Sequence, residues 1–241
     1  MSLQGKVCVI TGAAGNIGKA AVERFIEAGA VVVAVDRVQG EHEGIDWQVC
    51  DLGESSAILQ LEQYLKDKYG KIDCLVNNAG LGGIRTPFHE KTADEFDAIN
   101  RVNIRGPFEL MQVALRLHLD AGASSELVLL NISSIVATRP EPLASLYSMS
   151  RAAVLNLSHC VAKEYGRRNV RSVAVSPGFM EIPNIQGFTA DDKAVMYDNV
   201  PAGRGGKTRE VADTLCWLAS AEASYINGTE IKVDGGYHCS I

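Results

Sequence analysis

Short runs of apolar residues alternate with helical patterns along the whole chain. The first run, Lys6–Thr11, is apolar without polar alternation, which is typical of a strand buried on both faces of a sheet. Similar runs predict six further strands, at 31–35, 47–50, 73–76, 127–132, 170–175 and 230–233. Apolar residues at three- and four-residue spacing predict helices at 17–28, 58–69, 93–121, 147–165, 190–198 and 208–219. This alternation predicts a single α/β domain over residues 1–241, with a doubly wound parallel sheet of about seven strands.

A glycine-rich turn follows the first run. Gly12, Gly15 and Gly18 are spaced by three residues where the strand pattern gives way to a helical one. Glycines let a pyrophosphate approach the backbone, and the N–H groups at the start of a helix favour negative charge. An ordinary glycine-rich turn has the same local pattern. Asp36, however, ends the second strand about 20 residues further on, where a carboxylate can bind ribose hydroxyls, and the combination predicts a dinucleotide-binding unit.

Composition narrows the class of protein. The chain has 241 residues, 46% hydrophobic content and a mean hydropathy of +0.03, as expected for a globular protein. No apolar stretch precedes Val7 and no run approaches the length of a membrane span, so we expect no membrane anchor and a cytoplasmic location. The net charge of −6 argues against nucleic acid as a partner, and Arg167, Arg168 and Arg171 are expected to face solvent.

Cysteine and histidine usage gives no sign of a metal site. The six cysteines include no CxxC pair, which favours small buried thiols in a reducing compartment. The five histidines show no metal-ligand spacing, so we expect no bound metal.

Several further motifs occur in a specific order. They are Thr11-Gly12 with Gly18, Asn77-Asn78-Ala79-Gly80, Asn103, Ser134 with Tyr147 thirteen residues later, Ser176-Pro177-Gly178, and Val233-Asp234-Gly235-Gly236. On these motifs the chain resembles the classical short-chain dehydrogenase/reductase family over essentially its whole length. The resemblance implies a Rossmann fold and an NAD(P)-dependent oxidoreductase that acts on small-molecule alcohols and ketones. It also implies a homotetramer or homodimer.

The resemblance further implies which residues bind the cofactor, from the phosphate turn through the adenine and ribose to the nicotinamide. They are Gly12, Asn16, Ile17, Gly18, Asp36, Arg37, Asp51, Leu52, Asn78, Tyr147, Arg151 and Met180. Asp36 would repel a 2′-phosphate and Gly15 offers no basic side chain, so NAD is predicted in preference to NADP. Arg37 leaves NADP open, because an arginine beside the ribose can pair with a phosphate.

The implied catalytic residues are Asn103, Ser134, Tyr147 and Arg151. Hydride transfer from an alcohol needs a base for the hydroxyl proton, and a free phenol titrates only near pH 10. A nearby cation must therefore favour the phenolate, and Arg151 lies four residues from Tyr147 on one face of a predicted helix. Ser134 is expected to bind the substrate oxygen, and Asn103 to support a proton path to solvent.

Arg151 departs from the family, which has lysine at this position. Arginine keeps the charge but effectively never deprotonates, so it cannot readily relay a proton. Three outcomes remain open: an oxidoreductase with a modified proton path, a non-redox epimerase or dehydratase on the same scaffold, or an NAD-binding regulatory protein without turnover. We favour the first, because Asn103, Ser134 and Tyr147 persist.

Two smaller departures concern cofactor contacts. Asn16 replaces a glycine, and asparagine tolerates left-handed backbone better than most residues. Ile182 replaces a threonine with which many members contact the nicotinamide carboxamide.

The substrate pocket is expected to be lined by 82–85, 136–141 and an irregular lid segment at 179–207. An inward-facing Arg85 or Arg139 would imply a carboxylate or phosphate on the substrate, although exposure to solvent is the commoner fate of loop arginines. The C-terminal residues 237–241 are candidates for contact with a neighbouring subunit.

Overall fold

A single parallel sheet forms the centre of the molecule. The computed structural model describes residues 1–40, 44–182 and 197–239. Within them, seven strands are arranged in the order β3-β2-β1-β4-β5-β6-β7. They are β1 (Val7–Thr11), β2 (Val31–Asp36), β3 (Asp46–Val49), β4 (Cys74–Asn77), β5 (Leu127–Ile132), β6 (Val170–Pro177) and β7 (Glu230–Val233). The predicted sheet is confirmed, and the strand bounds differ from expectation by at most two residues.

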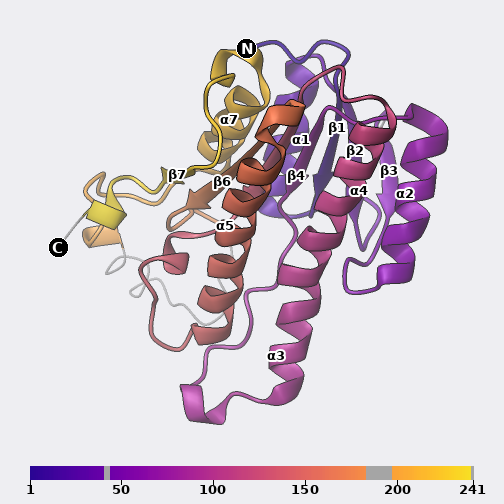
Figure 1. Ribbon diagram of the computed structural model, residues 1–241. Helices are drawn as coiled ribbons and strands as arrows, with labels where there is room; N and C mark the ends of the chain where they lie inside the picture. The colour runs from indigo at the N-terminus through magenta and orange to yellow at the C-terminus, as the bar shows by residue number, and fades with distance from the viewer. Residues whose placement is uncertain (41–43, 183–196, 240–241) are drawn as a thin grey trace.

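Helices cover both faces of the sheet (Figure 1). On one face lie α1 (Asn16–Glu27) and α7 (Thr208–Ala219), and on the other α2 (Ser55–Tyr69), α4 (Gly106–Asp120) and α5 (Ser145–Tyr165). Short turns of 3₁₀ helix are η1 (Phe88–Glu90), η3 (Ile135–Ala137), η4 (Gly166–Arg168), η5 (Ala221–Ala223) and η6 (Tyr237–Cys239). The helix expected at 190–198 lies largely outside the described residues.

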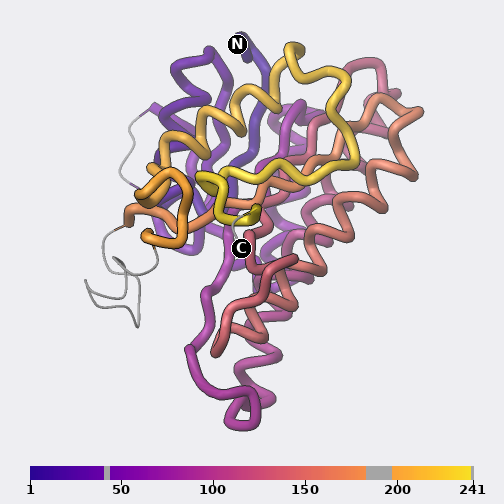
Figure 2. The backbone as a smooth tube through the Cα atoms, turned by 90° about the vertical axis from the view of Figure 1, so that its left-hand side faces the viewer, coloured from indigo at the N-terminus to yellow at the C-terminus, as the bar shows by residue number. Residues whose placement is uncertain are grey.

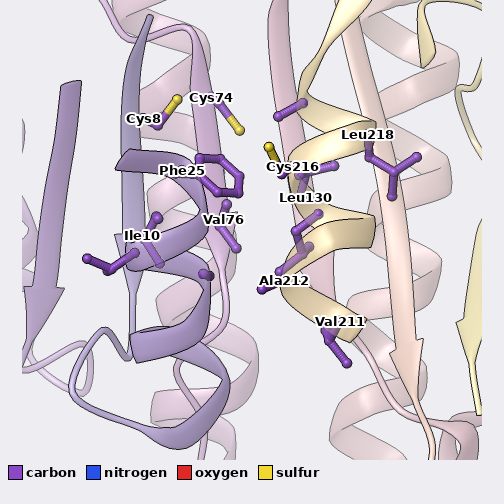
Figure 3. Close-up of a cluster of buried hydrophobic side chains, with 14 of the residues drawn as sticks. Cys8, Ile10, Phe25, Cys74, Val76, Leu130, Val211, Ala212, Cys216 and Leu218 are labelled. Atoms are coloured by element: carbon purple, nitrogen blue, oxygen red, sulfur yellow. The ribbon is translucent and has the colours of Figure 1, made fainter. Parts of the chain in front are cut away.

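Alternate residues of the central strands enter two different cores. Cys8 and Ile10 of β1 face α1 and α7, where they pack in one cluster with Phe25, as Figure 3 shows. Val9 between them faces α2 and α4 and belongs to the second cluster. All of these side chains have no solvent exposure. Burial on both faces explains why the strand sequences are apolar without alternation.

The helical pattern at 93–121 forms one interrupted rod. It begins with α3 (Ala93–Asn100), whose N-terminus carries a capping box between Thr92 and Glu95. A π-helical turn, η2 (Arg101–Arg105), joins α3 to α4. The rod projects past the sheet in two perpendicular views (Figures 1 and 2). The sequence pattern predicted the helix but not its interruption.

Arg171 corrects one expectation. It lies in β6 with only 4% of its surface exposed, where its guanidinium donates to both carboxylate oxygens of Glu126 at 2.8 and 3.0 Å and to the Ser220 carbonyl at 3.3 Å. The prediction that Arg171 faces solvent is therefore wrong. Its buried charge is compensated by the carboxylate of Glu126, 45 residues away in the chain.

The cysteines follow expectation in part. Four are buried (Cys8, Cys50, Cys74 and Cys216), whereas Cys160 and Cys239 are exposed, and all six are free thiols. Burial raises the pKa of Cys50 to about 11, and the nearby Asp51 carboxylate adds to the rise. In the ranges that the structure describes, no helix is long and apolar enough to span a membrane.

A network around Asp46 fastens α2 to the edge strand β3. The carboxylate accepts hydrogen bonds from the hydroxyls of Tyr64 and Tyr69, each at 2.7 Å, from Lys68 at 3.1 Å, and from Gln48 at 2.7 Å. Burial opposes ionisation of Asp46, but the hydrogen bonds from the two tyrosines, Gln48 and Lys68 outweigh it, so the pKa of Asp46 is lowered. Since β3 leads directly into Asp51 and Leu52, the network also steadies the loop that follows.

Asp46→Asn should lower the free energy of unfolding at neutral pH by about 1–3 kcal/mol, because an amide carries no charge for these donors. A lowered folded-state pKa stabilises the native state fully above the unfolded value of 3.8, and this stabilisation is lost as pH falls through the folded-state pKa. In urea unfolding, the difference between wild type and variant should therefore shrink below about pH 4.

The exposed Asp67→Asn on the same helix is the control, expected to change stability by less than about 0.5 kcal/mol. A difference for Asp46→Asn that stays constant into acid would contradict the assignment.

Candidate active site

The turn between β1 and α1 can hold a phosphate group. Gly12 has a φ of +64°, and a Cβ there would lie 2.8 Å from the Ala79 Cα atom. Gly18 packs behind the turn, with no room for a Cβ against the Gly12 carbonyl oxygen. No side chain caps the first turn of α1, and no acidic residue lies in it, so its N–H groups are available to an anion.

A cavity of about 690 Å³ opens beside this turn. Nine of the predicted cofactor residues line it: Gly12, Asn16, Ile17, Asp36, Arg37, Asp51, Leu52, Asn78 and Met180. Gly18 is not among the lining residues, because it packs behind the turn. Three features of this cavity suit a dinucleotide. They are the uncapped start of α1, the glycines that have no room for a side chain, and the Asp36 carboxylate in the wall.

Asp36 and Asn78 are held in place by the backbone. The Asp36 carboxylate accepts from Ala14 N at 3.0 Å and from Val38 N at 3.3 Å. The Asn78 side-chain amide donates to the carbonyls of Thr11 at 2.9 Å and Gly12 at 3.2 Å. These hydrogen bonds connect the carboxyl ends of the neighbouring strands β1, β2 and β4.

Asn16 needs no left-handed backbone. It is the first residue of α1, and its N-cap Gly15 has an extended conformation with φ −78° and ψ 171°. The expectation that Asn16 is accepted for its left-handed tolerance is therefore wrong, since an ordinary residue fits there. Ile182 lines the cavity with an apolar side chain.

A second cavity, of about 410 Å³, continues from the first. The two share four lining residues, namely Ile17, Asn78, Met180 and Ile182. Ser134, Tyr147 and Arg151 line the second cavity, so the structure brings three of the four predicted catalytic residues together. Ser134 Oγ accepts from Val136 N at 3.3 Å, which leaves its proton for another acceptor.

Arg151 lies beneath the ring of Tyr147. Its Cζ is 5.0 Å from the ring centroid, and its Nη1 donates to the Ile132 carbonyl at 3.0 Å. Only 4% of the residue is exposed, and its Nε has no hydrogen-bond partner in the described part of the chain. The two residues thus share one face of α5, as the spacing of four predicted. Among the described residues no hydrogen bond joins the guanidinium to the Tyr147 hydroxyl.

Gly80 makes room for this guanidinium. A Cβ at Gly80 would overlap the Nη2 atom of Arg151. The end of the planar fork therefore occupies the space that a side chain at position 80 would take.

Asn103 lies behind the cavities and lines neither. It sits in the π-helical turn, fully buried, with Oδ1 accepting from Leu81 N at 2.7 Å and Nδ2 donating to Leu81 O at 2.9 Å and Ser150 Oγ at 3.0 Å. Its side chain braces the segment after Gly80 against α5. The proton path expected of Asn103 stays a prediction.

The loop arginines differ in position. Arg85 lines the second cavity and donates to the Pro142 carbonyl at 3.0 Å. Arg139 does not line it; its guanidinium lies over the ring of Tyr237, with Cζ 4.4 Å from the centroid. Tyr237 is buried within its own chain, which no pattern in the sequence indicated. The expected contact of residues 237–241 with a neighbouring subunit stays a prediction, and residues 240–241 lie outside the described range.

Metal ligands are not grouped in the described ranges: no three or more of His, Cys, Asp and Glu lie together where they could hold an ion.

Comparisons with known proteins agree with this architecture. A family model described as enoyl-(acyl carrier protein) reductase matches residues 12–238. The 3-oxoacyl-[acyl-carrier-protein] reductase of Thermotoga maritima is 36% identical over 247 residues, covering 98% of this chain and 99% of that protein. Cis-4-hydroxycyclohexanecarboxylate dehydrogenase of Sinomonas cyclohexanicum is 32% identical over 243 residues, covering 96% of each.

Solved structures give the same result. The crystal structure of 3-ketoacyl-(acyl-carrier-protein) reductase from Brucella melitensis complexed with NADH matches with a TM-score of 0.92 and 32% identity, covering 98% of this chain and 100% of that one. With the sheet order, the glycine turn and the paired cavities already described, these similarities decide the family. The chain belongs to the short-chain dehydrogenase/reductase family of oxidoreductases.

Proposed function

We propose that this protein is an NAD-dependent dehydrogenase or reductase acting on a secondary alcohol or ketone. The observation that carries the proposal is that Ser134, Tyr147 and Arg151 line one cavity, which continues into the cavity beside the glycine turn. The relatives named above differ in the substrates their names give, so they support the reaction class and leave the substrate open. When bound, the nicotinamide supplies or accepts the hydride.

The residues of this chain handle the proton. In oxidation Tyr147 takes the hydroxyl proton of the substrate, and in reduction it returns one to the carbonyl oxygen. Ser134 donates a hydrogen bond to that oxygen. The buried Arg151 guanidinium lies under the ring of Tyr147, with its Cζ 5.0 Å from the ring centroid. Because arginine does not release its own proton, the half-buried Tyr147 exchanges its proton with solvent in the cavity and not through Arg151.

NAD is the proposed cofactor because of Asp36. Its carboxylate is fixed by Ala14 N and Val38 N in the cavity wall, where a 2′-phosphate would meet a negative charge and ribose hydroxyls would meet an acceptor. The solved relative from Brucella melitensis is complexed with NADH, which supports the same choice. Arg37 lines the same cavity but is exposed, so it can turn toward solvent.

A second candidate is NAD binding without turnover. It is favoured by the position of the Arg151 guanidinium, which donates to Ile132 O and lies under the ring of Tyr147 instead of at its hydroxyl. The two candidates differ in what Arg151→Lys should do.

A panel of secondary alcohols with NAD should give reduced nicotinamide, followed by absorbance. Tyr147→Phe should lower kcat by about a hundredfold or more, because it removes the acid–base group, while calorimetry still detects NAD binding. Tyr165→Phe, at the other end of α5, is the matched control and should stay near wild-type activity. A silent wild type that gains turnover in Arg151→Lys would instead support the binding protein.

Asp36→Ala should raise the ratio of kcat/KM for NADP to that for NAD by about tenfold or more, since a repulsive charge is removed from the ribose site. Asp51→Asn, which alters another carboxylate that lines the same cavity, should leave the ratio within about twofold of wild type. An unchanged ratio in Asp36→Ala would show that another group selects the cofactor.

Gly80→Ala should destabilise the protein by about 1–3 kcal/mol, because the new methyl group forces the Arg151 fork to move. Gly82→Ala, with no atom near its Cβ position, is the control and should cost less than about 0.5 kcal/mol. In an Arg151→Lys background the loss of unfolding free energy caused by Gly80→Ala should be smaller, since lysine lacks the Nη2 atom that the new methyl group would meet. Urea unfolding of the double-mutant cycle measures this coupling, and additive effects would refute it.

A further inference from the structure

Glu141 is the carboxylate in the wall of the second cavity. It lies between η3 and α5, and it shares that cavity with Ser134 and Tyr147. Its Oε1 accepts a hydrogen bond from the Tyr237 hydroxyl at 2.5 Å. No other residue in the described part of the chain donates to this carboxylate, so Oε2 is left for water or a ligand. An ionised carboxyl group has about four acceptor sites, and here the protein uses one of them.

Tyr237 is built into the fold in a way that holds Glu141 still. The ring is 7% exposed, with Phe179 edge-on at 4.8 Å between centroids and the Arg139 guanidinium over its face. Arg139 also donates to the Tyr237 carbonyl at 2.6 Å. Burial and the Glu141 carboxylate both raise the pKa of Tyr237, so the hydroxyl stays a donor.

A second arginine contacts the same segment. Arg85 donates to the carbonyl of Pro142, next to Glu141 in the chain. Residues 139–142 are therefore held by Arg85 from the loop after β4 and by Tyr237 from the C-terminal turn. The Asp234 carboxylate stabilises the C-terminal turn by accepting hydrogen bonds from Gly236 N at 3.0 Å and His238 N at 2.9 Å.

A carboxylate so placed discriminates between substrates. An alcohol with a purely apolar body would strip water from Oε2 and put nothing in its place, which is unfavourable for a charged acceptor. A second hydroxyl or an ammonium group on the substrate would replace that water with a charge-assisted hydrogen bond.

We infer that Glu141 is a specificity residue that accepts a hydrogen bond from a second donor group of the substrate, a hydroxyl or ammonium, and that Tyr237 is its positioning residue. The inference rests on the proposed function, since it concerns the alcohol or ketone bound beside Tyr147. It assigns the substrate class: diols, polyols or amino alcohols, and not simple alcohols.

The test compares cyclohexanol, cyclohexane-1,3-diol, 3-aminocyclohexanol and 3-hydroxycyclohexanecarboxylate with NAD. In the wild type, kcat/KM for the diol and the amino alcohol should exceed that for cyclohexanol by about tenfold or more. In Glu141→Gln the amino alcohol should lose this advantage, and the diol should keep part of it because the amide carbonyl still accepts. Glu164→Gln, exposed on α5, is the matched control and should keep the wild-type ranking.

Tyr237→Phe separates positioning from folding. With the hydroxyl gone and the ring retained, KM for the diol should rise several-fold more than kcat falls, while KM for NAD stays within about twofold of wild type. A purely structural loss would change the NAD value and kcat as well, and that outcome would count against the positioning role.

Failure of the inference is distinguishable from failure of the proposed function. A preference for the hydroxy acid that Glu141→Gln leaves unchanged would overturn the inference while leaving the oxidoreductase intact. If nothing is turned over, calorimetry of the diol and cyclohexanol on the protein with NAD decides the matter. A tenfold difference in affinity that disappears in Glu141→Gln would support the inference without redox activity, and equal or absent binding would overturn it.

Discussion

Both cavities depend on the order of strands at the centre of the sheet. β1 pairs with β2 on one side and with β4 on the other. Helix α1, which follows β1, and helix α4, which follows β4 after α3, belong to cores on opposite faces. The loops after β1 and β4 must therefore diverge, which opens a crevice beyond the carboxyl ends of the strands. Asn78 closes the floor of this crevice by binding the backbone of Thr11 and Gly12.

The parts of this architecture that the sequence predicted are those with a local cause. Burial on both faces explains the run of apolar residues from Val7 to Ile10 in β1. A strand followed by Gly12 and an uncapped helix can be recognised from about a dozen neighbouring residues. The role of Asp36 could be predicted from the same strand–turn–helix–strand unit, because it ends the second strand of that unit. The spacing of Tyr147 and Arg151 is local too, because it is one turn of α5.

Other features depend on partners far away in the chain. The π-helical turn goes with Asn103, whose amide binds the backbone of Leu81, 22 residues earlier. Arg171 is buried because Glu126 lies beside it, and Tyr237 because Arg139 and Phe179 enclose it. The orientation of Arg151 is of the same kind, since spacing could place it beside Tyr147 but not show that its fork fills the space left by Gly80. A local sequence pattern carries no information about such distant pairs.

The four residues common to the two cavities also bear on how this protein can be altered. Ile17, Asn78, Met180 and Ile182 touch both spaces, whereas Val136, Glu141 and Ala144 line only the smaller one. Variant libraries that aim to broaden the range of accepted substrates should therefore vary the residues that line only the smaller cavity. A change at any of the four shared residues would alter the shape of both cavities at once.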